Sequence, residues 1–119
     1  MNNNDLTGRR FKDKDGTEYV VAAGNEGDVI AYEDIKNPNA PLYFCCDAFV
    51  IDNRLRGTYF VSYTVSKAEF FKVIEQFSEQ EKMSVETIVS ALRKKNFKIP
   101  TLFLRLIGKV YMKEREGKA

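Results

Sequence analysis

The hydrophobic period of this chain changes once, near residue 66, and this change constrains the fold more than any other feature. Before it, apolar and polar residues alternate in short runs, as in residues 58–65. After it, apolar residues recur three and four positions apart, as in Phe70, Val73, Ile74 and Phe77. Strands gathered in one half and helices in the other are typical of an α+β fold.

The strand-rich half, residues 1–65, predicts a curled antiparallel sheet of four or five strands spanning residues ~9–65. Turn signals at residues 14–16 and 25–28 separate predicted strands at 9–12, 17–23 and 29–33. A loop rich in proline and asparagine, residues 35–41, precedes a strand at 42–46. A last strand is predicted at 58–65.

Residues 47–57 are ambiguous between a strand and a turn. Residues 49–51 can extend the preceding strand past a bulge, with Asp52 and Asn53 starting a turn toward Gly57.

The helical half, residues 66–119, predicts three α-helices, at ~67–77, ~84–96 and ~100–115. Ser66 with Glu69 forms a capping box for the first helix, and Ser84 can cap the second. Asn96 is expected to end the second helix, and Pro100 suits the first turn of the third.

The third helix carries apolar residues over an arc of roughly 200°, wider than a surface helix needs. Two explanations stay open: the helix is central to the core, or it shares a face with a partner, including a possible homodimer. The apolar residues are Leu102, Phe103, Leu104, Leu106, Ile107, Val110 and Tyr111.

Length favours a single domain over residues 1–119, because 119 residues can bury one core. No apolar run approaches the roughly 20 residues of a membrane-spanning helix, and the first residues lack the pattern of a secretory signal. We therefore expect a cytoplasmic protein with no membrane association. Adjacent Cys45 and Cys46 point to opposite faces of a strand, which favours two reduced thiols over a disulfide.

Histidine is absent, and its absence excludes more function classes than any other feature. Imidazole zinc sites, histidine general bases and Ser-His-Asp or Cys-His nucleophilic sites cannot form. No glycine-rich phosphate loop is present either. We expect neither an enzyme of these classes nor a bound cofactor or metal.

Charge is strongly uneven along the chain. Residues 1–65 contain seven Lys/Arg and ten Asp/Glu, whereas residues 66–119 contain twelve and seven. Because concentrated charge steers association, we expect the helical half to contact a partner; solvation and the helix dipole are the competing explanation for the same cations. The candidate contact residues are Arg93, Lys94, Lys95, Lys98, Arg105, Lys109, Lys113 and Arg115.

The leading hypothesis is a small noncatalytic binding or regulatory protein whose basic helical face contacts an acidic protein surface or nucleoprotein. One concrete form, suggested only by small size and missing catalytic groups, is a phage or mobile-element inhibitor of a host nucleic-acid-processing machine. The alternative is direct, mainly non-specific nucleic-acid binding through the same cations.

Three weaker patterns complete the candidates. The start of the third helix, residues 101–104, is too apolar to read bases as a helix-turn-helix does. A stacking platform is conceivable on the sheet, although core packing explains its residues better: Tyr32, Tyr43, Phe44, Tyr59, Phe60 and Tyr63. Finally, Asp28, Asp34 and Lys36 echo a metal-dependent nuclease, although a solvated turn is the better explanation.

Overall fold

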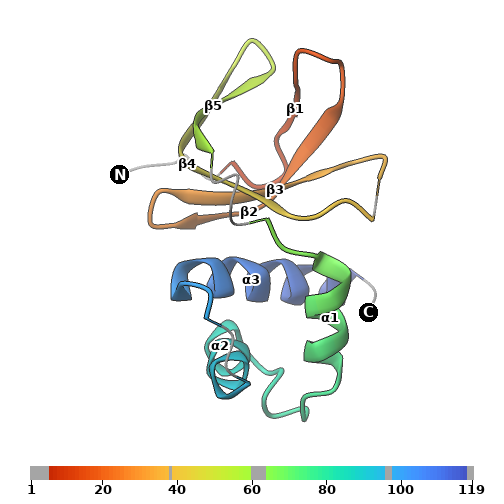
Figure 1. The fold of residues 1–119 in the computed structure, drawn as a ribbon, viewed down its shortest axis with the longest axis vertical. Helices are drawn as coiled ribbons and strands as arrows, with labels where there is room; N and C mark the ends of the chain where they lie inside the picture. Colours follow the sequence, from red (N-terminus) through yellow and green to blue (C-terminus); the bar gives the residue numbers. More distant parts are fainter. Residues whose placement is uncertain (1–5, 38, 60–63, 96–97, 118–119) are drawn as a thin grey trace. The chain divides into compact units, whose positions relative to one another are not determined.

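The computed structural model describes residues 6–37, 39–59, 64–95 and 98–117. Two compact units are present, Met1–Ser66 and Lys67–Ala119, and their boundary lies one residue beyond that of the predicted strand-rich and helical halves. Five antiparallel strands are followed by three helices (Figure 1), which confirms the α+β class. That the two units form one cooperative domain stays a prediction.

The strand unit is a meander in which every strand pairs with its neighbours in the sequence. Its sheet order is β1-β2-β3-β4-β5, so the upper value of the predicted strand number is correct. The sheet curls enough for the Lys12 amide to donate a hydrogen bond to the Asn53 carbonyl oxygen at 2.7 Å. The strands are β1 (Arg10–Lys12), β2 (Glu18–Glu26), β3 (Val29–Asp34), β4 (Tyr43–Ile51) and β5 (Arg54–Tyr59).

The last hairpin differs from the sequence prediction. β4 continues to Ile51 past a bulge between Cys46 and Phe49, as the open alternative allowed. Asp52 and Asn53, at φ 51° and 60°, make the tight turn alone, so β5 begins at Arg54 rather than at residue 58. The predicted turn toward Gly57 is therefore wrong, and residues 60–63 lie outside the described part.

Gly57 lies inside β5 and has a φ of 145° that favours glycine. A Cβ atom there would stand 2.5 Å from the Cys46 carbonyl oxygen and 2.6 Å from the Cys45 Sγ. The strand can pass this bulged stretch of β4 only because residue 57 has no side chain.

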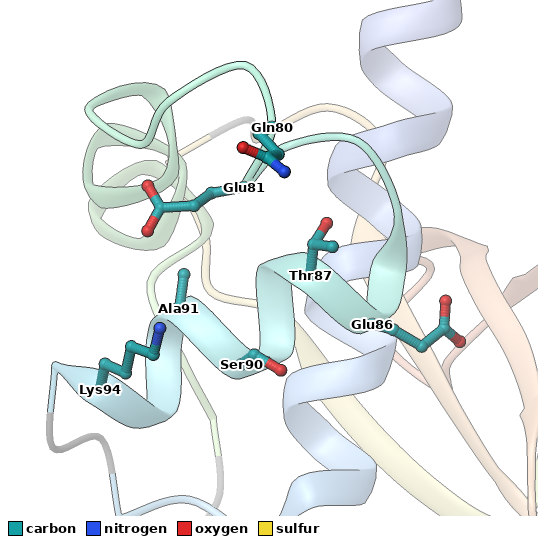
Figure 2. Close-up of a pocket in the computed structure, with 7 residues that line it drawn as sticks. All are labelled: Gln80, Glu81, Glu86, Thr87, Ser90, Ala91 and Lys94. Atoms are coloured by element: carbon teal, nitrogen blue, oxygen red, sulfur yellow. The ribbon is translucent and has the colours of Figure 1, made fainter.

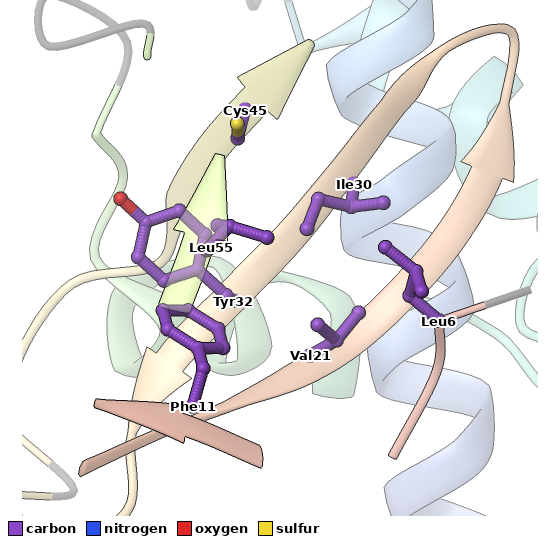
Figure 3. Close-up of a cluster of buried hydrophobic side chains, with 7 residues drawn as sticks. All are labelled: Leu6, Phe11, Val21, Ile30, Tyr32, Cys45 and Leu55. Atoms are coloured by element: carbon purple, nitrogen blue, oxygen red, sulfur yellow. The ribbon is translucent and has the colours of Figure 1, made fainter. Parts of the chain in front are cut away.

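The core of the strand unit lies on one face of the curled sheet (Figure 3). Cross-strand pairs place side chains of adjacent strands on the same face, as for Val21 with Tyr32 and Ile30 with Cys45. The seven buried members are Leu6, Phe11, Val21, Ile30, Tyr32, Cys45 and Leu55.

The helical unit contains α1 (Lys67–Glu75), α2 (Val85–Lys94) and α3 (Thr101–Gly117), close to the three predicted helices. Ser84 caps α2 as expected: its Oγ accepts the Thr87 amide at 3.1 Å, and the Thr87 Oγ1 accepts the Ser84 amide at 2.9 Å. Lys95 is the C-cap of α2. The predicted end at Asn96 lies outside the described residues.

α3 packs against both other helices of its unit. Val85 of α2 lies beside Gly108, where a Cβ would be 3.4 Å from the Val85 Cγ1, and the Phe71 ring of α1 meets the Tyr111 ring edge-on at 5.2 Å. Of the seven apolar residues in its wide arc, six are buried and Leu102 is half-buried. This arc is not open to solvent, and a homodimer through α3 stays a prediction.

The described helices are all too short or too polar to cross a membrane. Both cysteines are free thiols, Cys45 buried and Cys46 half-buried, as the alternation of the strand predicts.

Candidate contact surfaces

The eight predicted contact cations occupy two places in the helical unit. Arg93 and Lys94 lie in the last turn of α2, Lys95 caps it, and Lys98 precedes α3. The other four, Arg105, Lys109, Lys113 and Arg115, belong to α3.

We call the first group the α2–α3 corner and define it as Arg93, Lys94, Lys95 and Lys98. All four are exposed. The Arg93 guanidinium donates a hydrogen bond to the Thr101 Oγ1, so the end of α2 is tied to the start of α3. Four cations within six residues are therefore held at one junction of two helices.

The α3 cations do not share one face. Arg105, Lys109 and Lys113 repeat every four residues, which aligns them along one stripe of the helix. Arg115 follows Lys113 by two residues, a rotation of roughly 200°, and lies on the other side. The eight predicted residues consequently form no single surface.

Two arginines of α3 are paired with glutamates of their own unit. The Arg105 Nη1 lies 3.1 Å from the Glu86 Oε2, and the Arg115 Nη2 lies 2.7 Å from the Glu79 Oε1. Hydrogen bonding from Arg115 lowers the pKa of Glu79, and the same bond raises the pKa of Arg115. These two side chains are less available to a partner than the sequence suggested.

The lysines differ from these arginines. Among the residues that the structure describes, Lys94, Lys95, Lys98 and Lys113 are exposed and form no ion pair within 4.0 Å. Three of the four belong to the α2–α3 corner. Within the described part of the chain, most of the exposed cations of the predicted site that form no ion pair therefore lie at this corner, and Lys113 is the one that lies on α3.

A pocket of about 360 Å³, lined mostly by polar residues, adjoins the corner (Figure 2). Lys94 and Glu86 lie at its opposite ends, and Glu81 lines it from the α1–α2 connection. The backbone amide of Ser78 lowers the pKa of Glu81, and Lys94 and Lys95 lower it further. An ionised Glu81 is an acceptor beside the corner, not a general acid near neutral pH.

The nuclease-like acids are not brought together. Asp28 precedes β3 and Asp34 ends it, so about 20 Å of extended strand separates them. The Asp34 Oδ1 instead accepts the Lys36 amide at 2.9 Å in a local turn. Within the described ranges no three metal-ligating side chains cluster.

The Cys45 thiol is also unsuited to nucleophilic chemistry. Burial raises its pKa to about 11, with the neighbouring Cys46 and Asp47 adding to the effect. The thiolate, which is the reactive form, is therefore scarce at neutral pH.

Aromatic rings from all five strands meet on the core face of the sheet. Phe11 stacks on Tyr19 at 5.3 Å, Tyr32 stacks on Tyr43 at 5.3 Å, and Tyr59 meets Tyr32 edge-on at 6.3 Å. Of the residues considered for a platform, Tyr32, Tyr43 and Tyr59 join this cluster. Phe44 alternates to the opposite face, and Phe60 and Tyr63 lie outside the described residues.

Sequence reasoning missed a cationic cavity of about 330 Å³ at the seam between β1 and β5. Its lining includes Lys12, Lys14, Arg54 and Arg56 together with Phe11 and Tyr59. Because residues 1–65 carry a net negative charge, the sequence did not indicate that four of their cations line one cavity. The Asp52-Asn53 turn could have placed Arg54 and Arg56 on one strand, whereas their approach to Lys12 and Lys14 depends on the curl of the sheet.

Comparison with known proteins finds no protein-family model, curated protein or solved structure that matches this chain. Function must therefore be inferred from the chemistry of its own residues.

Proposed function

We propose that this protein is a noncatalytic binding protein that docks its α2–α3 corner onto an acidic protein surface. The observation that carries the proposal is the concentration of four exposed cations at a junction fixed by the Arg93–Thr101 hydrogen bond. Because this bond ties the end of α2 to the start of α3, the four side chains project from one place and their charges add.

The charge of the patch determines mainly how fast a partner associates and how strongly salt weakens the association. Each exposed ion pair contributes only about 0–1 kcal/mol, so the cations act mainly on the rate and orientation of encounter. The Debye length is about 8 Å at physiological salt, so steering acts at short range and weakens as salt rises.

An acidic protein surface suits the corner better than bare nucleic acid. Phe103 and Leu104, near the start of α3, are buried and cannot reach a base. Occupation of an acidic surface on a host nucleic-acid-processing machine, as by a phage or mobile-element inhibitor, is one form of this proposal.

A pair of charge-matched variants tests the corner. Lys95→Glu/Lys98→Glu reverses two of its charges, and Lys36→Glu/Lys72→Glu makes the same change at exposed lysines outside it. Each tagged protein is used to capture partners from cells that naturally express it, with and without nuclease treatment.

We expect a partner that survives nuclease treatment and is captured by the wild type and the Lys36/Lys72 variant but lost with the corner variant. Equal capture by both variants would refute the corner as the docking site. Loss of every partner after nuclease treatment would show that nucleic acid, not protein, is what the chain binds.

A further inference from the structure

The cavity at the β1–β5 seam lies between two fixed turns. The Asp13 carboxylate Oδ1 accepts the amides of Asp15 at 2.9 Å and Thr17 at 3.0 Å, which holds the β1–β2 turn that carries Lys12 and Lys14. The Lys12 amide bonds the Asn53 carbonyl oxygen at 2.7 Å, which joins this side to the turn before Arg54. The two sides of the cavity are therefore connected through the backbone.

The lining of this cavity is strongly cationic. Lys12, Lys14, Arg54 and Arg56 all line it and are exposed, and none forms an ion pair with a carboxylate of the described residues. The one acid in the lining, Asp13, accepts hydrogen bonds from its own turn and lies 3.3 Å from the Tyr19 hydroxyl. This excess of positive charge favours a ligand that carries more than one negative charge.

Tyr59 adds a flat surface to the same cavity. Its hydroxyl donates to the Leu55 carbonyl oxygen at 2.6 Å and its ring meets Tyr32 edge-on, so the ring is held in place. Even so, 45% of the residue is exposed. An exposed aromatic ring with a fixed orientation is suited to stack against another ring.

We propose that this cavity binds a nucleotide unit, with phosphate held by the four cations and the base stacked on Tyr59. Planar Arg54 and Arg56 can grip phosphate oxygens by paired hydrogen bonds, and the lysines act as point charges. A cavity of about 330 Å³ accommodates one such unit. The unit can be a free nucleotide or part of a single strand of nucleic acid.

Two variants of the intact chain separate the charge from the ring. Arg54→Gln/Arg56→Gln removes two exposed cations, and Tyr59→Leu removes the ring while keeping an apolar side chain. The matched control, Lys36→Gln/Lys72→Gln, removes the same charge elsewhere. Far-ultraviolet circular dichroism and a thermal melt establish that each variant is folded, and the arginine pair tests the site even if Tyr59→Leu does not fold.

Binding is measured by calorimetry with thymidine monophosphate, thymidine, inorganic phosphate, phosphotyrosine and a short oligothymidylate. We expect each cavity variant to bind the tightest thymidine probe about tenfold more weakly, which is the usual contribution of one stacked base or one charged contact. The control should match the wild type. If the oligothymidylate binds, the arginine variant should also lower the slope of log affinity against log salt by about 1.4.

The probes also distinguish the source of the unit. Equal affinity for the monophosphate and the oligothymidylate identifies a free nucleotide, whereas binding of the oligothymidylate alone identifies a single strand. Failure of both to bind, unchanged binding by the arginine variant, or equal affinity for phosphate or phosphotyrosine would overturn the proposal. The corner variant Lys95→Glu/Lys98→Glu should bind all probes as the wild type does, because it changes a different unit.

Discussion

The two units of this protein use their charges in opposite ways. The helical unit has an excess of cations, yet Arg105 and Arg115 are paired with its own glutamates. The strand unit has an excess of acids, yet four of its cations line one cavity. Net charge of a segment therefore says little about the charge at its surface site, because local pairing decides which cations remain accessible.

The units also differ in what holds them together. The strand unit relies on rings and on a bulge that requires glycine, whereas the helical unit relies on helix caps and on close packing at Gly108. A substitution that disrupts one of these features should therefore destabilise the unit that contains it more than the other unit.

The largest expected effect comes from the aromatic cluster. Tyr32 contacts four other rings, so Tyr32→Ala should lower the free energy of unfolding by about 4 kcal/mol through lost burial and a cavity. Chemical denaturation followed by tyrosine fluorescence and helical circular dichroism measures this loss. Tyr32→Phe, which keeps the ring, should cost less than about 1 kcal/mol. Coincident transitions in both signals would support a single cooperative domain.

Gly57→Ala should have the second largest effect, a loss of about 3 kcal/mol from the clash with β4 and the unfavourable φ. Gly108→Ala is its counterpart in the helical unit and should instead stabilise by up to about 1 kcal/mol, since the added methyl makes an ordinary contact with Val85. Urea unfolding of both variants measures the difference in sign. A loss at Gly108 as large as the loss at Gly57 would contradict the packing around Gly108, and an unchanged stability of Gly57→Ala would contradict the close approach of β5 to β4.

A smaller effect is expected at the start of α2. Ser84→Ala removes the hydrogen bond that the Ser84 Oγ accepts from the Thr87 amide, while the backbone amide of residue 84 can still donate to the Thr87 Oγ1. The loss of this bond should lower the free energy of unfolding by about 1 kcal/mol. Ser90→Ala, an exposed position within α2, is the matched control and should cost nothing. Thermal melting followed by circular dichroism compares them, and equal melting temperatures would argue against the cap.

An effect that is confined to alkaline pH involves one tyrosine in each unit. Burial, with Asp13 beside Tyr19 and Glu75 beside Tyr111, raises the pKa of each phenol to about 12. Both values exceed the unfolded value of 10.0, so the phenols stabilise the fold fully below pH 10 and lose this contribution as pH rises toward 12.

An alkaline titration followed by NMR of the assigned tyrosine ring signals measures these two ionisations separately from those of the other four tyrosines. Glu75→Gln should lower the pKa of Tyr111 and leave that of Tyr19 unchanged, because the carboxylate that disfavours the phenolate is removed from one unit only. A common shift of both phenols would indicate that the two units respond together.

Local sequence signals predicted most of the fold. Ser84 and the apolar spacing after it located α2, and the alternation around Cys45 located β4 and the faces of both thiols. β5 was misplaced because Gly57 resembles a turn residue, while its actual role depends on a bulge in the neighbouring strand. A glycine required by tertiary contact cannot be distinguished locally from one required by a turn.

The candidate sites were predicted less well, because they depend on residues far apart in the sequence. No sequence pattern near Arg105 indicates that it pairs with Glu86, and none near Arg115 indicates that it pairs with Glu79. Likewise, Lys12 and Arg54 are brought to one cavity only by the curl of the sheet. The cations at 93–98 were found because they are neighbours along the chain.

The two edge strands of the sheet carry features that disfavour self-association. The two outermost strands are the usual templates on which further chains add, but β1 is only three residues long and β5 presents arginines. These same arginines act as gatekeepers against edge-to-edge stacking into fibrils. Neutralising them is therefore expected to shorten the time for which concentrated protein stays monodisperse, even at an unchanged melting temperature.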